Sequence, residues 1–163
     1  MTKEEFLTDT ANWNNHKFCL WPALEATDGL VVEFGAGHGS TPSLYQYCKD
    51  NNRHFLSYDF NSEWADKFKD YGTRHVENWD LIGALKCDVI LIDHSPGERR
   101  WVDIERFANS AKIIVIHDSE PAATGYMLNK IWHLFKYRVD YKTEGAWASA
   151  VSNFLDVSKW QIS

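Results

Sequence analysis

The chain has 163 residues, a formal net charge of −6 and an aromatic content of 15%. This length suits a single domain, and the acidic balance argues against a protein that holds duplex DNA or an anionic membrane against a basic face. Nucleic acid is therefore an unfavoured partner, which only a local basic patch would permit.

The cysteines and the N-terminus indicate the compartment. Cys19, Cys48 and Cys87 are odd in number and lack CxxC spacing, which favours free thiols in a reducing environment. The first ten residues contain no apolar signal segment, and no apolar run approaches the roughly 18 residues that span a membrane. We expect a cytoplasmic protein without a membrane partner.

In chain order, short apolar runs alternate with amphipathic stretches, a pattern typical of a parallel sheet with crossover helices. The N-terminal part, residues 1–28, contains two expected helices, over 2–9 and 17–27. The core, residues 29–163, then begins with strand 30–34, helix 41–51, strand 54–58, helix 62–70 and a weak strand over 73–77.

The second half of the core contains the strongest strands. Residues 88–92 and 112–116 are nearly continuous branched side chains, as in strands buried on both faces of a sheet. Helices are expected over 99–109 and 122–135, and the alternating runs 137–143 and 147–154 would pair as an antiparallel hairpin. The sequence predicts one α/β domain over residues 1–163, with a seven-stranded, mostly parallel sheet, helices on both faces and a C-terminal antiparallel hairpin.

A glycine-rich segment, Glu33-Phe34-Gly35-Ala36-Gly37-His38-Gly39-Ser40, joins the first strand to the next helix, where an α/β sheet binds its ligand. Gly35 permits a tight turn, and Gly37 lets ligand atoms approach the backbone. Asp59 ends the second strand, where a carboxylate can accept both hydroxyls of a ribose. Such a loop is typical of dinucleotide enzymes and of methyltransferases.

Two details separate these classes. The dinucleotide pattern GxGxxG requires a glycine at position 40, which is Ser40, whereas the third glycine is Gly39. Glu33 lies in a buried strand, where a carboxylate needs a cation or hydrogen-bond donors, such as the amino group of a methionine moiety. These residues resemble the first motif of the class I S-adenosylmethionine-dependent methyltransferases, and the strand order of the whole chain is similar to theirs.

This resemblance implies a Rossmann-like fold and S-adenosylmethionine as the cofactor. Trp79 would stack on the adenine, with a core position as the alternative, and Asp80 would accept from the adenine amino group. The expected cofactor-binding residues are Glu33, Gly35, Ala36, Gly37, Gly39, Ser40, Asp59, Phe60, Trp79, Asp80 and Asp93.

Acidic and histidine residues follow two strands that are neighbours in this family. Asp93 and His94 follow strand 88–92, while His117, Asp118 and Ser119 follow strand 112–116. Two carboxylates in one cleft repel unless a cation lies between them, and Mg²⁺ takes oxygen ligands of this kind. Here the sequence resembles the metal-dependent catechol-type and sugar O-methyltransferases.

That resemblance implies Mg²⁺ held by Asp93, Asp118 and Ser119. Ser119 replaces the Asn or Asp of the family, so Glu120 is an alternative ligand, and the family's lysine base is missing. The expected catalytic residues are Asp93, His94, His117 and Asp118.

Either histidine could remove a proton near neutral pH, since the ordinary pKa is about 6.5. We favour His117 as the base. The alternatives are a structural histidine or ligation of a softer metal. We expect Arg99 and Arg100 to be solvent-exposed residues at the start of a helix. The alternative is that they recognise an anionic group of the substrate.

The sequence thus predicts an S-adenosylmethionine-dependent enzyme that methylates a hydroxyl of a small molecule. The alternatives are an inactive methyltransferase-like binding module and, less favoured, an NAD(P)-linked oxidoreductase. Acceptor contacts would come from the N-terminal helices, from loops 95–100 and 119–125, or from the second subunit of a homodimer.

Overall fold

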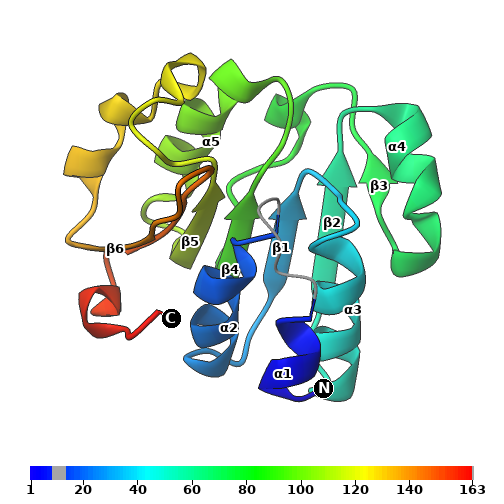
Figure 1. The fold of residues 1–163 in the computed structure, drawn as a ribbon. Helices are drawn as coiled ribbons and strands as arrows, with labels where there is room; N and C mark the ends of the chain where they lie inside the picture. The colour runs from blue at the N-terminus through cyan, green and yellow to red at the C-terminus, as the bar shows by residue number, and fades with distance from the viewer. Residues whose placement is uncertain (9–13, 163) are drawn as a thin grey trace.

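The computed structural model describes residues 1–8 and 14–162. Its centre is a seven-stranded sheet with strand order β3-β2-β1-β4-β5-β7-β6, in which β7 runs antiparallel to both of its neighbours, β5 and β6, and the other pairs are parallel (Figure 1). The strands are β1 (Val31–Phe34), β2 (Phe55–Asp59), β3 (Arg74–His75), β4 (Cys87–Ile92), β5 (Ala111–His117), β6 (Tyr137–Tyr141) and β7 (Ala148–Ser152). This arrangement confirms the predicted Rossmann-like sheet with its C-terminal antiparallel hairpin.

Helices cover both faces of the sheet, as predicted. They are α1 (Lys3–Phe6), α2 (Lys17–Glu25), α3 (Thr41–Asp50), α4 (Ser62–Lys67) and α5 (Arg100–Phe107). Successive side chains of a strand point to opposite faces, so β4 supplies Val89 and Leu91 to the core beneath α2 and α3. Ile90 and Ile92 enter the second core, beneath α5.

The largest departure from the predicted elements is the segment expected as a helix over 122–135. It forms three short 3₁₀ turns instead, over Thr124–Tyr126, Leu128–Lys130 and Trp132–Leu134. The apolar residues Leu128, Ile131 and Leu134 recur every three positions, which matches the three residues per turn of a 3₁₀ helix. Met127 has a left-handed backbone, with φ of 54°, and this interrupts any continuous α-helix.

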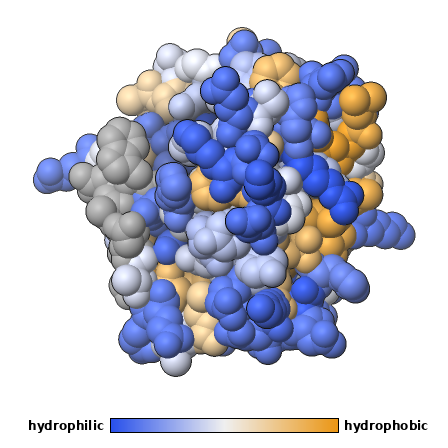
Figure 2. Space-filling view, turned by 90° about the vertical axis from the view of Figure 1, so that its right-hand side faces the viewer, coloured by the Kyte–Doolittle hydropathy of each residue, from blue (hydrophilic) through white to orange (hydrophobic). Residues whose placement is uncertain are grey.

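Two other predicted elements are shorter than expected. The N-terminal helix covers Lys3–Phe6, and the predicted position 9 lies outside the described residues. The weak strand over 73–77 is reduced to β3, whose two residues are both exposed. The face on the side of α4 and β3 is mostly hydrophilic (Figure 2). In the described parts of the chain, no helix combines the length and apolar character needed to cross a membrane.

The register of the central strands brings the candidate residues to one edge of the sheet. Phe34 pairs with Ile92, and Ile92 pairs with Ile116, in parallel register. The residues that follow these strand ends therefore begin at the same level. This places Gly35, Asp93 and the β5 end at His117 side by side.

Candidate active site

The turn after β1 is built for a close approach between two loops. Gly35 has a left-handed backbone, with φ of 95°, and its N–H donates to the carbonyl of Tyr58 on β2. A Cβ atom at Gly35 would lie 2.5 Å from the backbone oxygen of Asp93, which no side chain can tolerate. Gly37 has no such neighbour, because its Cβ would lie 3.8 Å from the nearest atom, the hydroxyl of Ser40. The absence of a side chain at Gly35 therefore allows the β1 and β4 loops to lie in close contact.

Glu33 is a fully buried carboxylate within β1. Its Oε2 accepts hydrogen bonds from the hydroxyls of Ser57 (2.6 Å) and Thr41 (2.9 Å). Its Oε1 is buried and has no partner among the described residues. Burial raises the pKa of Glu33 to about 7, although the neighbouring hydroxyls oppose this shift. Two hydroxyls therefore bind Oε2, and the Ser40 hydroxyl also lowers the pKa of this carboxyl, whereas Oε1 has room for a further donor.

Asp59, at the end of β2, is oriented by the backbone. The N–H of Ala36 donates to Oδ2 (2.9 Å) and the N–H of Asn61 donates to Oδ1 (2.8 Å). Burial raises the pKa of Asp59, and these two N–H groups oppose the shift. Each oxygen accepts one backbone bond, so each retains capacity for a further donor.

A pocket of about 350 Å³ opens beside Asp59. It is lined by Gly35, Ala36, Asp59, Phe60, Asn61, Trp64, Asp93 and Ser95. The volume lies within the range of small-molecule sites. The structure thus brings Gly35, Ala36, Asp59, Phe60 and Asp93 of the predicted cofactor residues together in one pocket. Trp64 and Asn61, on and before α4, were missed because nothing local in the sequence separates them from other surface positions.

Gly39 and Ser40 lie at the start of α3, away from the lining of that pocket. A Cβ atom at Gly39 would meet the side chain of Asn14 at 1.7 Å, so this glycine makes room for the N-terminal segment. Ser40 is buried, at the position preceding α3. Both residues shape the loop that carries the pocket.

A cation does lie between Asp93 and Asp118, and it is a side chain. The Arg100 guanidinium donates to Oδ1 of Asp93 (2.9 Å) and to Oδ2 of Asp118 (3.2 Å). Arg100 also donates to the carbonyls of His94 (2.9 Å) and His117 (3.3 Å). It is only 5% exposed, so the expectation of a solvated helix start is wrong for this arginine.

The predicted Mg²⁺ site does not fit this arrangement. The Arg100 guanidinium takes the position between the two carboxylates, where an ion would be needed. Ser119 is 2% exposed, and its hydroxyl accepts from Ser149 at 2.7 Å. Glu120, the alternative ligand, accepts from the backbone N–H of Trp147. We therefore derive no chemistry through an ion between Asp93 and Asp118.

His117 ends β5, is 5% exposed and is not among the residues that line the 350 Å³ pocket. Its Nδ1 lies 3.3 Å from Oδ1 of Asp93 and 3.5 Å from Oδ1 of Asp118, whereas its Nε2 is buried without a partner among the described residues. Burial lowers the pKa of His117, but the contact with Asp93 and the charges of both carboxylates outweigh it, so the net shift is upward. Burial raises the pKa of Asp93, yet His117 and Arg100 bring it down to about 2.

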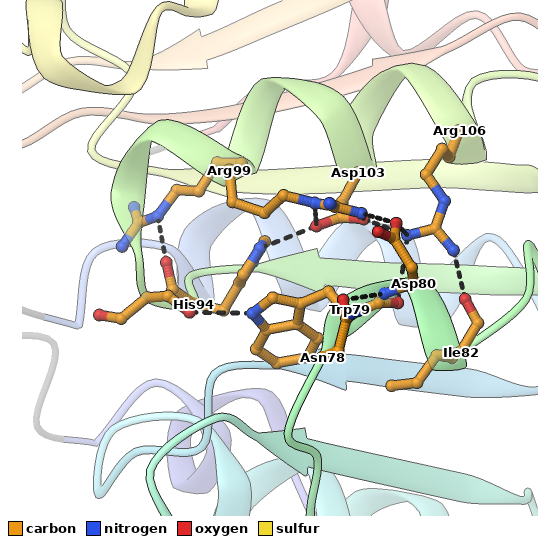
Figure 3. A network of polar contacts seen from close by, with 10 residues as sticks. Asn78, Trp79, Asp80, Ile82, His94, Arg99, Asp103 and Arg106 are labelled. Atoms are coloured by element: carbon orange, nitrogen blue, oxygen red, sulfur yellow. Dashed lines mark hydrogen bonds and ion pairs between the residues drawn. The ribbon is translucent and has the colours of Figure 1, made fainter.

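His94 lies in a different environment from His117. Its Nε2 contacts the buried carboxylate of Asp103 at 3.0 Å, and its ring packs edge-on against Trp79. Arg99 and Arg106 also bind Asp103, and Asp80 binds both arginines (Figure 3). His94 is 1% exposed, so the structure places it in a polar network of the core and not in the cleft.

Trp79 lies in the core, which was the alternative to its expected contact with the adenine. Its ring stacks on Phe34 with centroids 4.8 Å apart, and its Nε1 donates to the carbonyl of Ser95. The Asp80 side chain is 62% exposed and pairs with Arg99. Neither residue lines the 350 Å³ pocket.

A second pocket of about 540 Å³ is lined by the loop that follows β5, by residues of the 3₁₀ turns and by β6. Its walls include Ser119, Glu120, Met127, Lys130, Trp132 and Arg138. The Arg138 guanidinium stacks on the Trp132 ring, 3.4 Å from its centroid. An aromatic ring and two cations give this pocket the character of a site for a flat or anionic small molecule.

Comparison with known proteins identifies the fold. No protein-family model matches the sequence, and no curated protein matches it either. Cofactor-bound Rv0187 from MTB superposes with a TM-score of 0.64 at 14% identity, over 91% of this chain and 83% of that one. The O-methyltransferase TomG from Streptomyces achromogenes, solved with S-adenosylmethionine, gives 0.60 at 11% identity, over 85% and 78%.

A third structure, the S-adenosylmethionine-dependent O-methyltransferase TM0748 from Thermotoga maritima, gives a TM-score of 0.60 at 11% identity, over 83% of this chain and 64% of that one. At such identities the likeness concerns the fold alone. The chain has the fold of the class I S-adenosylmethionine-dependent methyltransferases.

Proposed function

We propose that this protein is an S-adenosylmethionine-dependent methyltransferase that acts on a hydroxyl group of a small molecule. The observation that carries the proposal is Glu33, a fully buried carboxylate beside the turn at Gly35, one oxygen of which has no partner in the described parts of the chain. A buried carboxylate with an orphaned oxygen fits the ammonium group of a methionine moiety. Glu33 therefore supports a cofactor that brings a positively charged amino group to this end of the sheet.

The other cofactor contacts follow from the 350 Å³ pocket. Asp59 would accept the two ribose hydroxyls, because each of its oxygens retains a lone pair after binding a backbone N–H. Phe60 and Trp64 would provide apolar surface for the adenine. Trp79 is not assigned this role because its ring is stacked in the core.

When bound, the cofactor supplies an electrophilic methyl group on a positively charged sulfur. The chain's own contribution is alignment of the acceptor oxygen and removal of its proton. We assign the proton to Nε2 of His117, which has no partner in residues 1–8 and 14–162, while Asp93 holds Nδ1 and stabilises the charged ring. Arg100 fixes Asp93 and Asp118 in turn.

For the acceptor we propose a small hydroxylated molecule that enters the 540 Å³ pocket. Trp132 and Arg138 suit a planar or anionic scaffold, and the net charge of −6 disfavours a polynucleotide.

A catalytically inactive binding module is the second candidate. The observation that favours it is Arg100, which neutralises the two carboxylates where related metal-dependent enzymes would need an ion.

The test combines binding with turnover. Calorimetry should show tight binding of S-adenosylhomocysteine and none of NAD. The protein would then be incubated with labelled S-adenosylmethionine and separate panels of hydroxylated small molecules, RNA and proteins. Label in a small molecule supports the proposal, and label only in RNA or protein contradicts the acceptor class. Cofactor binding without transfer to any panel would favour the binding module.

A further inference from the structure

Three metal-ligating side chains converge at the cleft from distant parts of the chain. His16 precedes α2, Asp93 follows β4 and His117 ends β5, and one ligand atom of each lies within 4.8 Å of the other two. The His16 and His117 rings pack edge to face, with centroids 4.9 Å apart. We propose that these residues form a binding site for a divalent transition-metal ion of the Zn²⁺ type.

The first argument is the lack of hydrogen-bond partners. Both ring nitrogens of His16 and Nε2 of His117 are buried without a partner among residues 1–8 and 14–162. His16 is 2% exposed and His117 is 5% exposed, so bulk solvent does not supply the missing contacts. Buried polar atoms in native proteins almost always have a partner. An ion between the two rings would provide one for a nitrogen of each.

The second argument is charge. Asp93 and Asp118 contribute two negative charges and Arg100 contributes one positive charge. With neutral imidazoles the cluster keeps a net charge of −1, which attracts a cation. The ion pairs of Asp93 with Arg100 and His117 both use Oδ1, and the Asp93 side chain is 24% exposed. The carboxylate of Asp93 can therefore offer an oxygen to an ion together with the two imidazoles.

The ligand set determines which ion fits. Two imidazole nitrogens and one carboxylate oxygen suit Zn²⁺ and neighbouring transition ions, whereas Mg²⁺ prefers oxygen ligands alone. Tetrahedral ligand atoms at bond lengths of about 2.1 Å lie roughly 3.4 Å apart. The three ligand atoms lie within 4.8 Å of one another, so an ion would draw them closer together.

The consequence for catalysis rests on the proposed function. Three protein ligands leave a coordination position for the acceptor oxygen. An ion on Nε2 of His117 excludes this nitrogen as the proton acceptor and instead lowers the pKa of the bound hydroxyl. The free base and the ion are thus alternative means of deprotonation, and metal binding itself does not depend on methyl transfer.

The experiment measures metal binding without turnover. Protein freed of purification tags and treated with chelator would be titrated with Zn²⁺ by calorimetry, and with Co²⁺ by visible absorption. One equivalent of each should bind, with Co²⁺ bands typical of tetrahedral coordination, and Mg²⁺ should give no heat. His16→Asn should weaken Zn²⁺ binding by at least about 100-fold.

His54→Asn is the matched control, because His54 is exposed at the opposite end of β2. Circular dichroism would verify that each variant is folded, and His117→Asn provides a second variant if His16→Asn fails to fold. Wild type that binds neither ion, or binding equally strong in His16→Asn and wild type, would overturn the proposal. S-adenosylhomocysteine binding is measured on the same samples. Its loss with metal binding intact would contradict the proposed function and leave the metal site standing.

Discussion

The two halves of the cleft differ in how their carboxylates are compensated. In the β1–β2 half, Glu33 and Asp59 contact only hydroxyls and backbone N–H groups, and burial raises the pKa of both. In the β4–β5 half, Asp93 and Asp118 contact the Arg100 guanidinium, and the pKa of Asp93 falls to about 2. The first half therefore requires a positive or donating ligand, whereas the second supplies most of its own counter-charge.

The histidines that follow β4 and β5 show a similar contrast. Both His94 and His117 adjoin an aspartate in the sequence, and each has a carboxylate partner. His94 is held by Asp103 of α5 inside the core, whereas His117 is held by Asp93 at the cleft. The same local motif thus yields a structural residue and a candidate base, and the partner element decides between them.

The largest expected effect is a loss of stability on substitution of Arg100, which binds two carboxylates. Arg100→Met should lower the free energy of unfolding by about 3 kcal/mol, because it leaves both acids without their cation. Urea denaturation would measure this loss. Added Mg²⁺ should stabilise the variant more than wild type, since the position between Asp93 and Asp118 becomes available to an ion.

Arg99→Met is the control for that variant. Asp103 keeps His94 and Arg106 when Arg99 is removed, and Arg99 is partly exposed. We expect a loss of about 1 kcal/mol or less. Equal losses in the two variants would contradict the distinction between Arg100, which joins two carboxylates, and Arg99, whose buried partner Asp103 keeps two other contacts.

The next effect concerns the turn that joins the two halves. Gly35→Ala should destabilise the fold by about 2–3 kcal/mol, since it adds an unfavourable backbone conformation and a contact with the Asp93 carbonyl. Gly37→Ala, two residues away, should change the unfolding free energy by less than about 1 kcal/mol. Thermal and urea unfolding of both variants would check this. A Gly35→Ala protein as stable as wild type would show that the loops are not held in close contact.

Cofactor affinity should respond to Asp59. Asp59→Ala removes the expected ribose acceptor and should weaken S-adenosylhomocysteine binding by about 1–3 kcal/mol. Calorimetry would measure the change. Asp66→Ala, on the exposed side of α4, should bind as wild type does. Full affinity in Asp59→Ala would remove this residue from the cofactor site.

The smallest effect is a pH dependence from Glu33. Its pKa of about 7 means that the carboxylate is mostly protonated at pH 6 and mostly ionised at pH 8. An ammonium ligand requires the ionised form, so affinity for S-adenosylhomocysteine should fall about tenfold from pH 8 to pH 6. Glu33→Gln should bind weakly with a flatter profile. Calorimetry at both pH values would contradict the assignment if wild-type affinity were constant.

The same shift affects folding with the opposite sense. A folded-state pKa above the ordinary value of 4.5 stabilises the fold below pH 4.5, and this contribution is lost as pH rises through about 7. Unliganded protein should therefore lose some unfolding free energy over this range. Glu33→Gln should not show that loss.

The cofactor half could be predicted from the sequence because its determinants are local. Glu33, Gly35 and Asp59 follow directly from strand ends and loop spacing, and the parallel register brings these ends together. Arg100 and His16 could not be assigned in this way. Arg100 reaches the cleft only because α5 packs over β4 and β5, and His16 arrives from a segment that spacing does not relate to β5.

The sequence pattern also failed to predict the environment of some apolar residues. Trp79 follows β3 at the expected place for an adenine contact, yet the ring fills space next to Phe34. The segment expected as a helix over 122–135 contains Leu128, Ile131 and Leu134 at a spacing of three residues, which matches a 3₁₀ helix better than an α-helix. In both cases the sequence pattern identified an apolar side chain without specifying what it packs against.

The two edges of the sheet bear on how copies of the protein meet in solution. Edge strand β3 has only two residues, both exposed, and Arg74 places a cation on it. At the other edge, Arg138 and Asp140 form an ion pair on β6, and the 3₁₀ turn at Val157–Lys159 packs against that strand. Short and charged edges resist pairing with a further strand. Growth of the sheet from one molecule into the next is therefore disfavoured at both ends, and any homodimer would have to form through the faces of the molecule.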